Sequence, residues 1–132
     1  MNFPVRIYYE DTDAGGVVYH ARYLHFFERA RTEFLRELGF TQQILIEQEQ
    51  LAFVVKKAEI DYKTPARLDD LLNVETTIME LKGVTIVFKQ QLWRGTDCLC
   101  EAIVTVASVN LNKMKPVAIP KMIKQAFQSK IY

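Results

Sequence analysis

Residues 23–38 read YLHFFERARTEFLREL, and this stretch decides the fold. At 100° per residue, its apolar side chains fall within one wide arc of a helix. These side chains are Tyr23, Leu24, Phe26, Phe27, Ala30, Phe34, Leu35 and Leu38. Gly39 follows directly and is a natural helix stop. Because so wide an apolar face must be buried, the stretch predicts a central helix that other elements cover.

Arg31 is a charged residue inside this apolar arc, and Glu28 lies three residues before it. Oppositely charged side chains at this spacing are neighbours on a helix surface. We therefore expect a buried structural ion pair between them. The alternative is that Glu28 belongs to an active site.

Strand patterns lie on both sides of the helix. In residues 3–10 apolar and polar side chains alternate, which predicts a half-buried first strand. After the helix, a shorter helix is expected within Thr41–Gln50 and a long strand from Ala52 to Tyr62. Turn signals at residues 82–83 and 94–97 then separate three further strands of a predicted antiparallel meander, Leu72–Leu81, Val84–Trp93 and Leu99–Leu111. Residues 120–127 predict a closing helix, with Pro120 in its first turn.

This order of one strand, one long helix and a run of strands predicts an α+β fold. The economical arrangement is an antiparallel sheet that curls around the long helix. No repeat or linker interrupts the sequence, so we expect one domain over residues 1–132. A domain of this size has little room for a deep cleft, which favours a homo-oligomer whose second copy completes the pocket.

The composition argues against several functional classes. The formal net charge is +1 without a basic tail, so no nucleic-acid partner is expected. The sequence has no run of about 18 apolar residues for a membrane span. Met1–Arg6 lack the features of a signal peptide, so the expected compartment is the cytoplasm. Cys98 and Cys100 are expected to be buried, reduced thiols on one face of a strand, because a metal site would need more ligands.

Familiar catalytic motifs are missing from the sequence, including the G-x-S-x-G elbow, the Walker-type phosphate loop and the H-E-x-x-H helix. Ser108 and Ser129 are the two serines, and neither has a histidine near it in sequence. A hydrolase with this sequence would therefore use a carboxylate as its nucleophile or base.

Residues 9–23, YEDTDAGGVVYHARY, combine three carboxylates, two glycines and a helix start. Glycines allow a backbone to approach a ligand closely, and N–H groups near a helix N-terminus stabilise a developing oxyanion. A carboxylate on the same loop could attack a thioester carbonyl or take a proton from water. The competing interpretation is a turn whose aspartates only cap the following helix.

The same run, continued by Phe27–Glu33, resembles the signature of the 4-hydroxybenzoyl-CoA thioesterase family. Within that family, the likeness is closest to the YbgC-type acyl-CoA thioesterases, which are encoded with the Tol-Pal cell-envelope system of Gram-negative bacteria. Ala52–Val55, Pro65–Asp70 and Lys113–Pro116 also resemble this group, so the likeness covers nearly the whole chain.

The resemblance implies a hotdog fold, in which a curved antiparallel sheet wraps a long central helix. It also implies dimers formed by pairing of the sheets, often assembled into tetramers, with active sites at the dimer interface. The family's catalytic carboxylate corresponds to Asp13, acting as nucleophile or general base. Gly16 and Val17 correspond to positions whose backbone N–H groups polarise the thioester carbonyl.

Other residues of the motif keep open roles. His20 stands where relatives can carry a tyrosine, so its role is not simply transferred; it is expected to orient Asp13 or a water molecule, or to have no function. A related hotdog subgroup places its carboxylate on the central helix, which keeps Glu28 as a second candidate. Asp11 is expected to shape the loop by accepting backbone hydrogen bonds.

The expected function is hydrolysis of short-chain acyl-CoA thioesters without a cofactor. Thioesters of acyl carrier protein are an alternative substrate, because both carriers present the same phosphopantetheine arm. Two further alternatives are a hotdog hydratase or dehydratase, whose motif is not apparent, and a non-catalytic module that binds acyl carrier protein or a cell-envelope partner. Phe53 or Phe27 could shorten the acyl pocket. Exposed basic residues could meet the CoA phosphates or be plain surface, namely Lys56, Lys57, Lys63 and Arg67.

Overall fold

A computed structural model describes residues 1–130 of the chain. The strands are β1 (Asn2–Arg6), β2 (Leu51–Tyr62), β3 (Leu71–Leu81), β4 (Thr85–Arg94), β5 (Asp97–Asn110) and β6 (Lys115–Pro116). The helices are α1 (Arg22–Glu37), α2 (Gln42–Glu49), α3 (Lys121–Gln128) and the short 3-10 helix η1 (Tyr9–Asp11).

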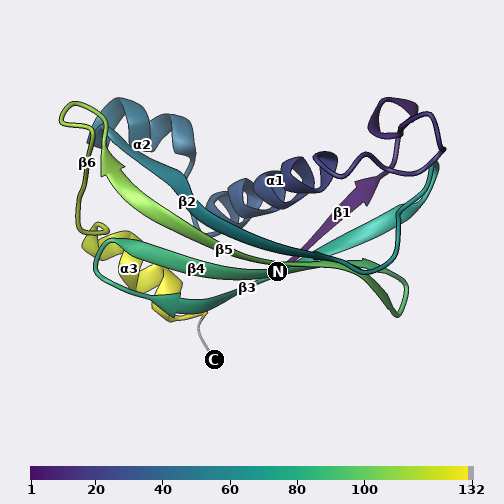
Figure 1. Cartoon of the computed structure of the whole chain (residues 1–132). Coiled ribbons are helices and arrows are strands. Elements are labelled where there is room, and N and C mark those ends of the chain that lie inside the picture. The colour runs from purple at the N-terminus through teal and green to yellow at the C-terminus, as the bar shows by residue number, and fades with distance from the viewer. Residues whose placement is uncertain (131–132) are drawn as a thin grey trace.

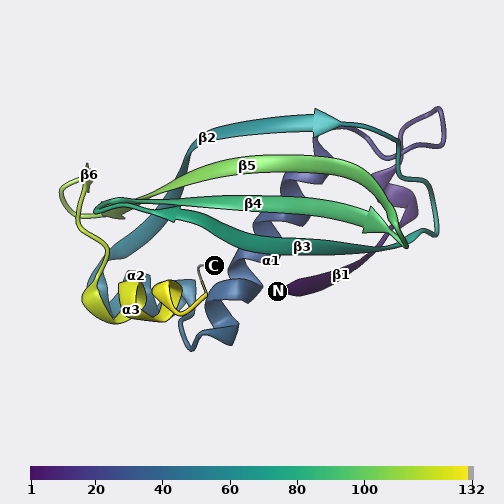
Figure 2. The same ribbon diagram turned by 90° about the horizontal axis from the view of Figure 1, so that it is seen from below.

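All strands belong to one antiparallel sheet of order β1-β3-β4-β5-β2, with β6 paired to β5. Strands β3, β4 and β5 form the predicted meander, and β2 and β1 lie at its two edges. The sheet curves, and α1 lies along its concave side (Figure 1). Seen from below, α1 lies behind the sheet, and α2 and α3 both lie toward one end of it (Figure 2). The predicted α+β hotdog fold is confirmed.

The core lies between α1 and the concave face of the sheet. Side chains along β3 and β4 alternate between buried and more exposed positions, as expected for strands with one covered face. The apolar side chains that these two strands bury are Leu72, Val74, Ile78, Ile86, Phe88 and Leu92. Against them α1 buries Tyr23, Phe26, Phe27, Ala30, Phe34 and Leu35. The contact explains why a helix with a wide apolar face is stable here.

The predicted helices are confirmed, with one difference in the apolar face of α1. Thr41 caps α2, because its side chain accepts a hydrogen bond from the Ile44 amide at 3.4 Å. Leu24, which was placed in the apolar arc, is 45% exposed. The covered face of α1 is therefore narrower than the periodicity alone predicts.

The first strand is shorter than predicted. It ends at Arg6, and Tyr9, which was expected to continue the alternation, is 82% exposed in η1. The turn is local in origin. The Asp11 carboxylate accepts a hydrogen bond from the Tyr8 amide at 2.8 Å, and this bond draws the backbone out of the extended conformation.

The predicted Glu28–Arg31 ion pair is wrong. Arg31 donates from Nη1 to Oε1 of Gln90 at 2.9 Å, whereas Glu28 accepts a hydrogen bond from the Thr32 hydroxyl at 3.2 Å. Gln90 is fully buried under α1, and its amide nitrogen donates to the Phe27 carbonyl at 2.9 Å. A buried amide must satisfy its oxygen as well, and Arg31 supplies that donor.

The two cysteines do not share one face of β5. Cys100 pairs with Leu92 and Cys98 with Trp93, so Leu99 is an extra residue in the ladder. This bulge leaves Cys98 half-buried and Cys100 fully buried. Both are free thiols, as expected. Burial raises the pKa of the Cys100 thiol to about 12, so it is protonated at neutral pH.

Phe127 gives a test of the packing at the α3 end of the core. It is fully buried, and its ring centroid lies 6.1 Å from that of Phe34 on α1. We expect Phe127→Ala to reduce the free energy of unfolding by about 3–5 kcal/mol, because truncation leaves a cavity. Urea denaturation measures this change. Met122→Ala on the same helix is the control, because Met122 is 72% exposed and its loss should change stability by less than about 0.5 kcal/mol.

Candidate active site

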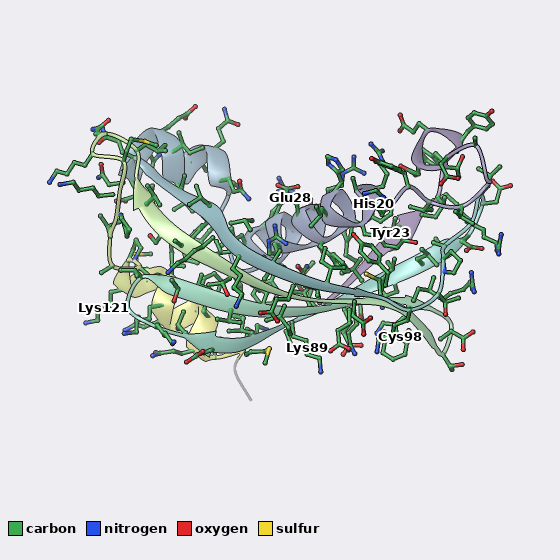
Figure 3. All side chains as sticks on the ribbon, in the orientation of Figure 1. His20, Tyr23, Glu28, Lys89, Cys98 and Lys121 are labelled. Atoms are coloured by element: carbon green, nitrogen blue, oxygen red, sulfur yellow. The ribbon has the colours of Figure 1, made fainter. Side chains whose placement is uncertain are left out.

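The predicted active-site loop joins η1 to α1, at the opposite end of the sheet from α2 and α3 (Figure 1). His20 lies just before α1 begins, and Glu28 lies near the middle of the helix (Figure 3). The loop therefore meets the N-terminal end of the helix, as the motif predicts.

Backbone hydrogen bonds fix the loop on both sides. The Val18 amide donates to the Ala66 carbonyl at 2.9 Å, and the Tyr19 amide donates to the Asp11 carbonyl at 2.9 Å. The buried Tyr23 hydroxyl accepts from the Ala66 amide at 3.0 Å, which ties α1 to the same neighbouring segment. The loop is thus held by its own ends and by the chain between β2 and β3.

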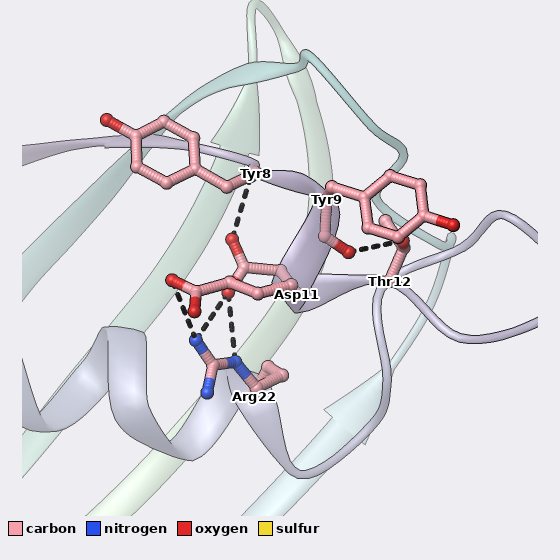
Figure 4. Close-up of polar contacts among 6 residues, drawn as sticks. Tyr8, Tyr9, Asp11, Thr12 and Arg22 are labelled. Atoms are coloured by element: carbon pink, nitrogen blue, oxygen red, sulfur yellow. Dashed lines mark hydrogen bonds and ion pairs between the residues drawn. The ribbon is translucent and has the colours of Figure 1, made fainter.

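Asp11 and Arg22 form the principal charged contact of this region (Figure 4). Oδ1 of Asp11 accepts from Nη2 and Nε of Arg22 at 2.6 and 2.9 Å, while Oδ2 accepts from the Tyr8 amide. Asp11 is buried, with 4% of its surface exposed. The expectation that Asp11 shapes the loop by accepting backbone hydrogen bonds is confirmed for the Tyr8 amide. The contact also ties the beginning of α1 to η1.

Asp13 lies exposed on the outer part of the loop. Its Oδ1 accepts a hydrogen bond from the Gly15 amide at 2.8 Å, and its other oxygen makes no hydrogen bond within residues 1–130. A Cβ on Gly15 would lie 3.2 Å from Oδ1, and Gly16 has a φ of +80°. Glycine is therefore favoured at the two positions for different reasons. At Gly15 a side chain would crowd the Asp13 carboxylate, and at Gly16 the positive φ would strain any other residue.

Gly16 and Val17 differ in the availability of their amides. The Gly16 N–H donates to the Asp13 carbonyl at 3.1 Å, which closes the turn. The Val17 carbonyl accepts from the Asp13 amide at 2.9 Å, but the Val17 N–H donates no hydrogen bond within the described part of the chain. Val17 thus presents an open backbone donor four residues after the exposed carboxylate.

His20 and Asp13 border different hollows of the single chain. His20 borders one of about 220 Å³, together with Tyr62 and Lys63. Asp13 borders an open one of about 400 Å³, together with Tyr9 and Leu68. The structure of one copy therefore does not bring His20 and Asp13 into a common hollow.

Glu28 borders a third hollow, between α1 and the sheet. Phe53 also borders it, whereas Phe27 is fully buried in the core and does not. Phe53 and Phe27 were the two residues expected to shorten an acyl pocket. Only Phe53 of these two lines this hollow and could limit its length.

The basic residues considered for phosphate binding differ in their partners. Lys57 pairs with Glu59 at 2.8 Å on the exposed surface of β2. Lys63 lies 3.6 Å from Asp61 and 3.8 Å from Glu101. Lys56 and Arg67 are exposed and form no ion pair within residues 1–130. The last two are thus the basic residues of this set without a carboxylate partner.

Within residues 1–130 no cluster of at least three metal-ligating side chains occurs, and no helix there has the length and apolarity to cross a bilayer.

Tyr62 is a residue of this region that the sequence did not identify. It ends β2, and its hydroxyl donates to the His20 carbonyl at 2.9 Å. The two residues are 42 positions apart, and nothing local to either one signals the contact. Arg22 was also missed, although an arginine at a helix start after an acidic loop is a signal of charge pairing.

Replacing Asp11 tests the role of the buried charge. We expect Asp11→Ala to lower the free energy of unfolding by about 1.5–3 kcal/mol, because Arg22 and the Tyr8 amide lose a charged acceptor. Thermal or urea denaturation measures the change, with Glu10→Ala as the control, because the Glu10 side chain is 74% exposed and its 4.0 Å ion pair with Arg22 contributes little. Equal stabilities of the two variants would contradict a structural role for Asp11.

Comparison with known proteins places the chain in a family. A family model described as the thioesterase-like superfamily matches residues 8–127. The chain is 68% identical over 127 residues to the acyl-CoA thioesterase YbgC of Haemophilus influenzae, covering 96% of this chain and 93% of that protein. The acyl-CoA thioester hydrolase YbgC of Escherichia coli is 52% identical over 129 residues, covering 97% and 96%.

A solved structure agrees with the sequence comparisons. The crystal structure of a probable thioesterase from Bartonella henselae has a TM-score of 0.87 and 42% identity, covering 91% of this chain and 98% of that one. The predicted thioesterase class is thereby confirmed. The chain belongs to the thioesterase-like superfamily.

Proposed function

We propose that the protein hydrolyses short-chain acyl-CoA thioesters to a free acid and CoA, with Asp13 as the catalytic carboxylate. The observation that carries this proposal is the exposed Asp13 carboxylate, held by the Gly15 amide at 2.8 Å on a loop with fixed ends. The relatives named as acyl-CoA thioesterases in Haemophilus influenzae and Escherichia coli supply the substrate class.

Asp13 serves the reaction by one of two routes. As a nucleophile, its free oxygen attacks the thioester carbonyl carbon, the C–S bond breaks, and water then hydrolyses the mixed anhydride to release the acid. As a general base, it takes a proton from water, whose oxygen attacks the same carbon. In both routes the CoA sulfur leaves as a thiolate and is protonated.

Backbone N–H groups stabilise the negative charge that forms on the carbonyl oxygen. Val17 is the better donor of the two candidates, because its N–H has no acceptor within residues 1–130, whereas the Gly16 N–H is already donated to Asp13. Gly16 contributes mainly by its backbone conformation, and its N–H can share a second acceptor. His20 orients Asp13 or a water molecule only if the hollow that it borders is joined to that of Asp13 in an assembly.

A dimer formed through β2 completes this site. In the described chain β2 pairs with β5 on one side and has an open second edge over its 12 residues. Val54 and Val55 on this strand are 43% and 54% exposed. An antiparallel pairing of two β2 strands about a two-fold axis near Ala58 would place Lys57 of one copy opposite Glu59 of the other. Association of two such dimers would give the tetramer.

Asp13→Asn tests the catalytic assignment. The substitution is nearly isosteric and removes the charge, so we expect a folded protein with kcat/KM reduced at least tenfold, or about 1.4 kcal/mol in barrier. The measurement is free-thiol release from acyl-CoAs of increasing chain length. Asp97→Asn, at the exposed first residue of β5, is the matched control. Retained activity in Asp13→Asn would move the assignment to Glu28.

The same assay separates the alternatives. Release of thiol from acyl carrier protein thioesters, with none from any acyl-CoA, would show that the substrate is carried by acyl carrier protein and not by CoA. No release from either class would favour a binding role.

Reversing a charge on β2 tests the dimer. We expect Glu59→Lys to raise the dimer dissociation constant about tenfold, because like charges would face each other twice across the two-fold axis. Adding Lys57→Glu to that variant should restore the dimer, because the charges are again opposite. Sedimentation equilibrium over a range of concentrations measures both. A wild type that stays monomeric throughout would contradict the proposal.

A further inference from the structure

The hollow between α1 and the sheet has a polar mouth and an apolar interior. Its volume is about 90 Å³, whereas one water molecule needs roughly 10–15 Å³ of space measured in this way. Glu28, Arg31 and Gln42 form its polar side, and the remaining lining is apolar. Those apolar residues are Leu35, Phe53, Val55, Ile86, Phe88, Val106 and Phe127.

Arg31 is the charged group that faces this hollow from within the fold. It is half-buried, and its single hydrogen bond within residues 1–130 is the one from Nη1 to Gln90. A guanidinium group has five N–H donors, so most of its donors have no protein acceptor. Burial lowers the pKa of Arg31 and the nearby Glu28 carboxylate raises it, and an arginine stays protonated at neutral pH.

The Arg31 side chain is held in a defined position. The Gln90 amide nitrogen donates to the Phe27 carbonyl at 2.9 Å and to the Thr76 hydroxyl at 3.0 Å. These two bonds fix the amide, so its oxygen must point to Arg31. The guanidinium is therefore preorganised for a ligand in the hollow, which reduces the entropy lost on binding.

Glu28 does not neutralise this charge by direct contact. No carboxylate of residues 1–130 forms an ion pair with Arg31. Glu28 is exposed, and its carboxylate accepts from the Thr32 hydroxyl, which in turn accepts from the Gln42 amide at 2.8 Å. Glu28 thus acts on Arg31 through space from the exposed side of the hollow, and not as a bonded partner.

We propose that this hollow selects acyl groups whose far end carries a carboxylate, with Arg31 as the residue that recognises it. The carboxylate would accept hydrogen bonds from the unpaired N–H groups of Arg31. Such charge-assisted hydrogen bonds are stronger than those between neutral groups. The methylene groups would contact Phe53 and Val55. The substrates are then thioesters of short dicarboxylic acids. This inference rests on the proposed thioesterase function.

The proposed dimer connects the hollow to the catalytic loop. When two β2 strands pair antiparallel, the C-terminal end of one lies beside the N-terminal end of the other. Tyr62, which contacts the His20 carbonyl, ends β2, while Phe53 and Val55 lie near its beginning and border the hollow. The loop of one copy and the hollow of the other would then face one substrate.

The experiment compares thioesters of equal carbon number with and without a terminal carboxylate. Glutaryl-CoA is measured beside valeryl-CoA, and adipyl-CoA beside hexanoyl-CoA, with enzyme-free blanks for spontaneous hydrolysis. For the wild type we expect kcat/KM to be at least tenfold higher for the carboxylate-bearing member of at least one pair. Free glutarate should also inhibit at lower concentration than free valerate.

Variants of Arg31 identify the residue responsible. Arg31→Met keeps the length of the side chain without its charge, and it should reduce kcat/KM for glutaryl-CoA at least tenfold more than kcat/KM for valeryl-CoA. Arg31→Lys should restore part of the preference, because a cation remains. Arg29→Met is the control, since Arg29 is exposed on α1 and does not border the hollow. Thermal unfolding and the oligomeric state are compared for all variants.

The outcomes separate this inference from the proposed function. Hydrolysis of valeryl-CoA at least as efficient as that of glutaryl-CoA, with no selective inhibition by glutarate, would overturn the inference and leave the thioesterase function intact. Equal losses on both substrates in Arg31→Met would also overturn it. No thiol release from any acyl-CoA would overturn both. If Arg31→Met does not fold, the wild-type substrate pairs and the two free acids decide the question.

Discussion

The burial of α1 against the concave side of the sheet is the constraint on which the rest of the structure depends. Phe26, Phe27 and Phe34 reach their buried positions only because β3, β4 and β5 curve beneath them. Burying side chains of this size contributes about 1.5–3 kcal/mol each, more than any exposed ion pair of the chain. The helix direction is thereby set, and its first turn lies beside the loop that carries Asp13.

The polar groups at this interface have consequences beyond stability. Gln90 lies fully buried under α1, and its amide would be costly without partners. Phe27, Thr76 and Arg31 satisfy it, so a cation is held over an apolar hollow. A group needed to complete the packing of the fold therefore also gives this hollow its positive charge.

The loop shows how a small fold presents an exposed carboxylate without losing order. Asp11 is buried and paired with Arg22, whereas Asp13, two residues later, is exposed and held by the Gly15 amide alone. The two aspartates of the motif thus differ, because one is buried and stabilises the loop while the other is exposed on its surface. Within residues 1–130, β2 has an open edge, and Asp13 and His20 border separate hollows.

The sequence by itself determined the elements, the fold class and the family, because these depend on short-range periodicity, on turn residues and on a motif within 15 consecutive positions. It also identified Asp11 as a structural acceptor. It misplaced the partner of Arg31, the faces of Cys98 and Cys100 and the end of β1. Gln90, Tyr62 and a bulge at Leu99 act across strands, and no pattern along the chain records which residues meet. Only the tertiary structure decided the contacts of Gln90 and Tyr62, because the curvature and register of the sheet bring together residues that lie 42 to 63 positions apart.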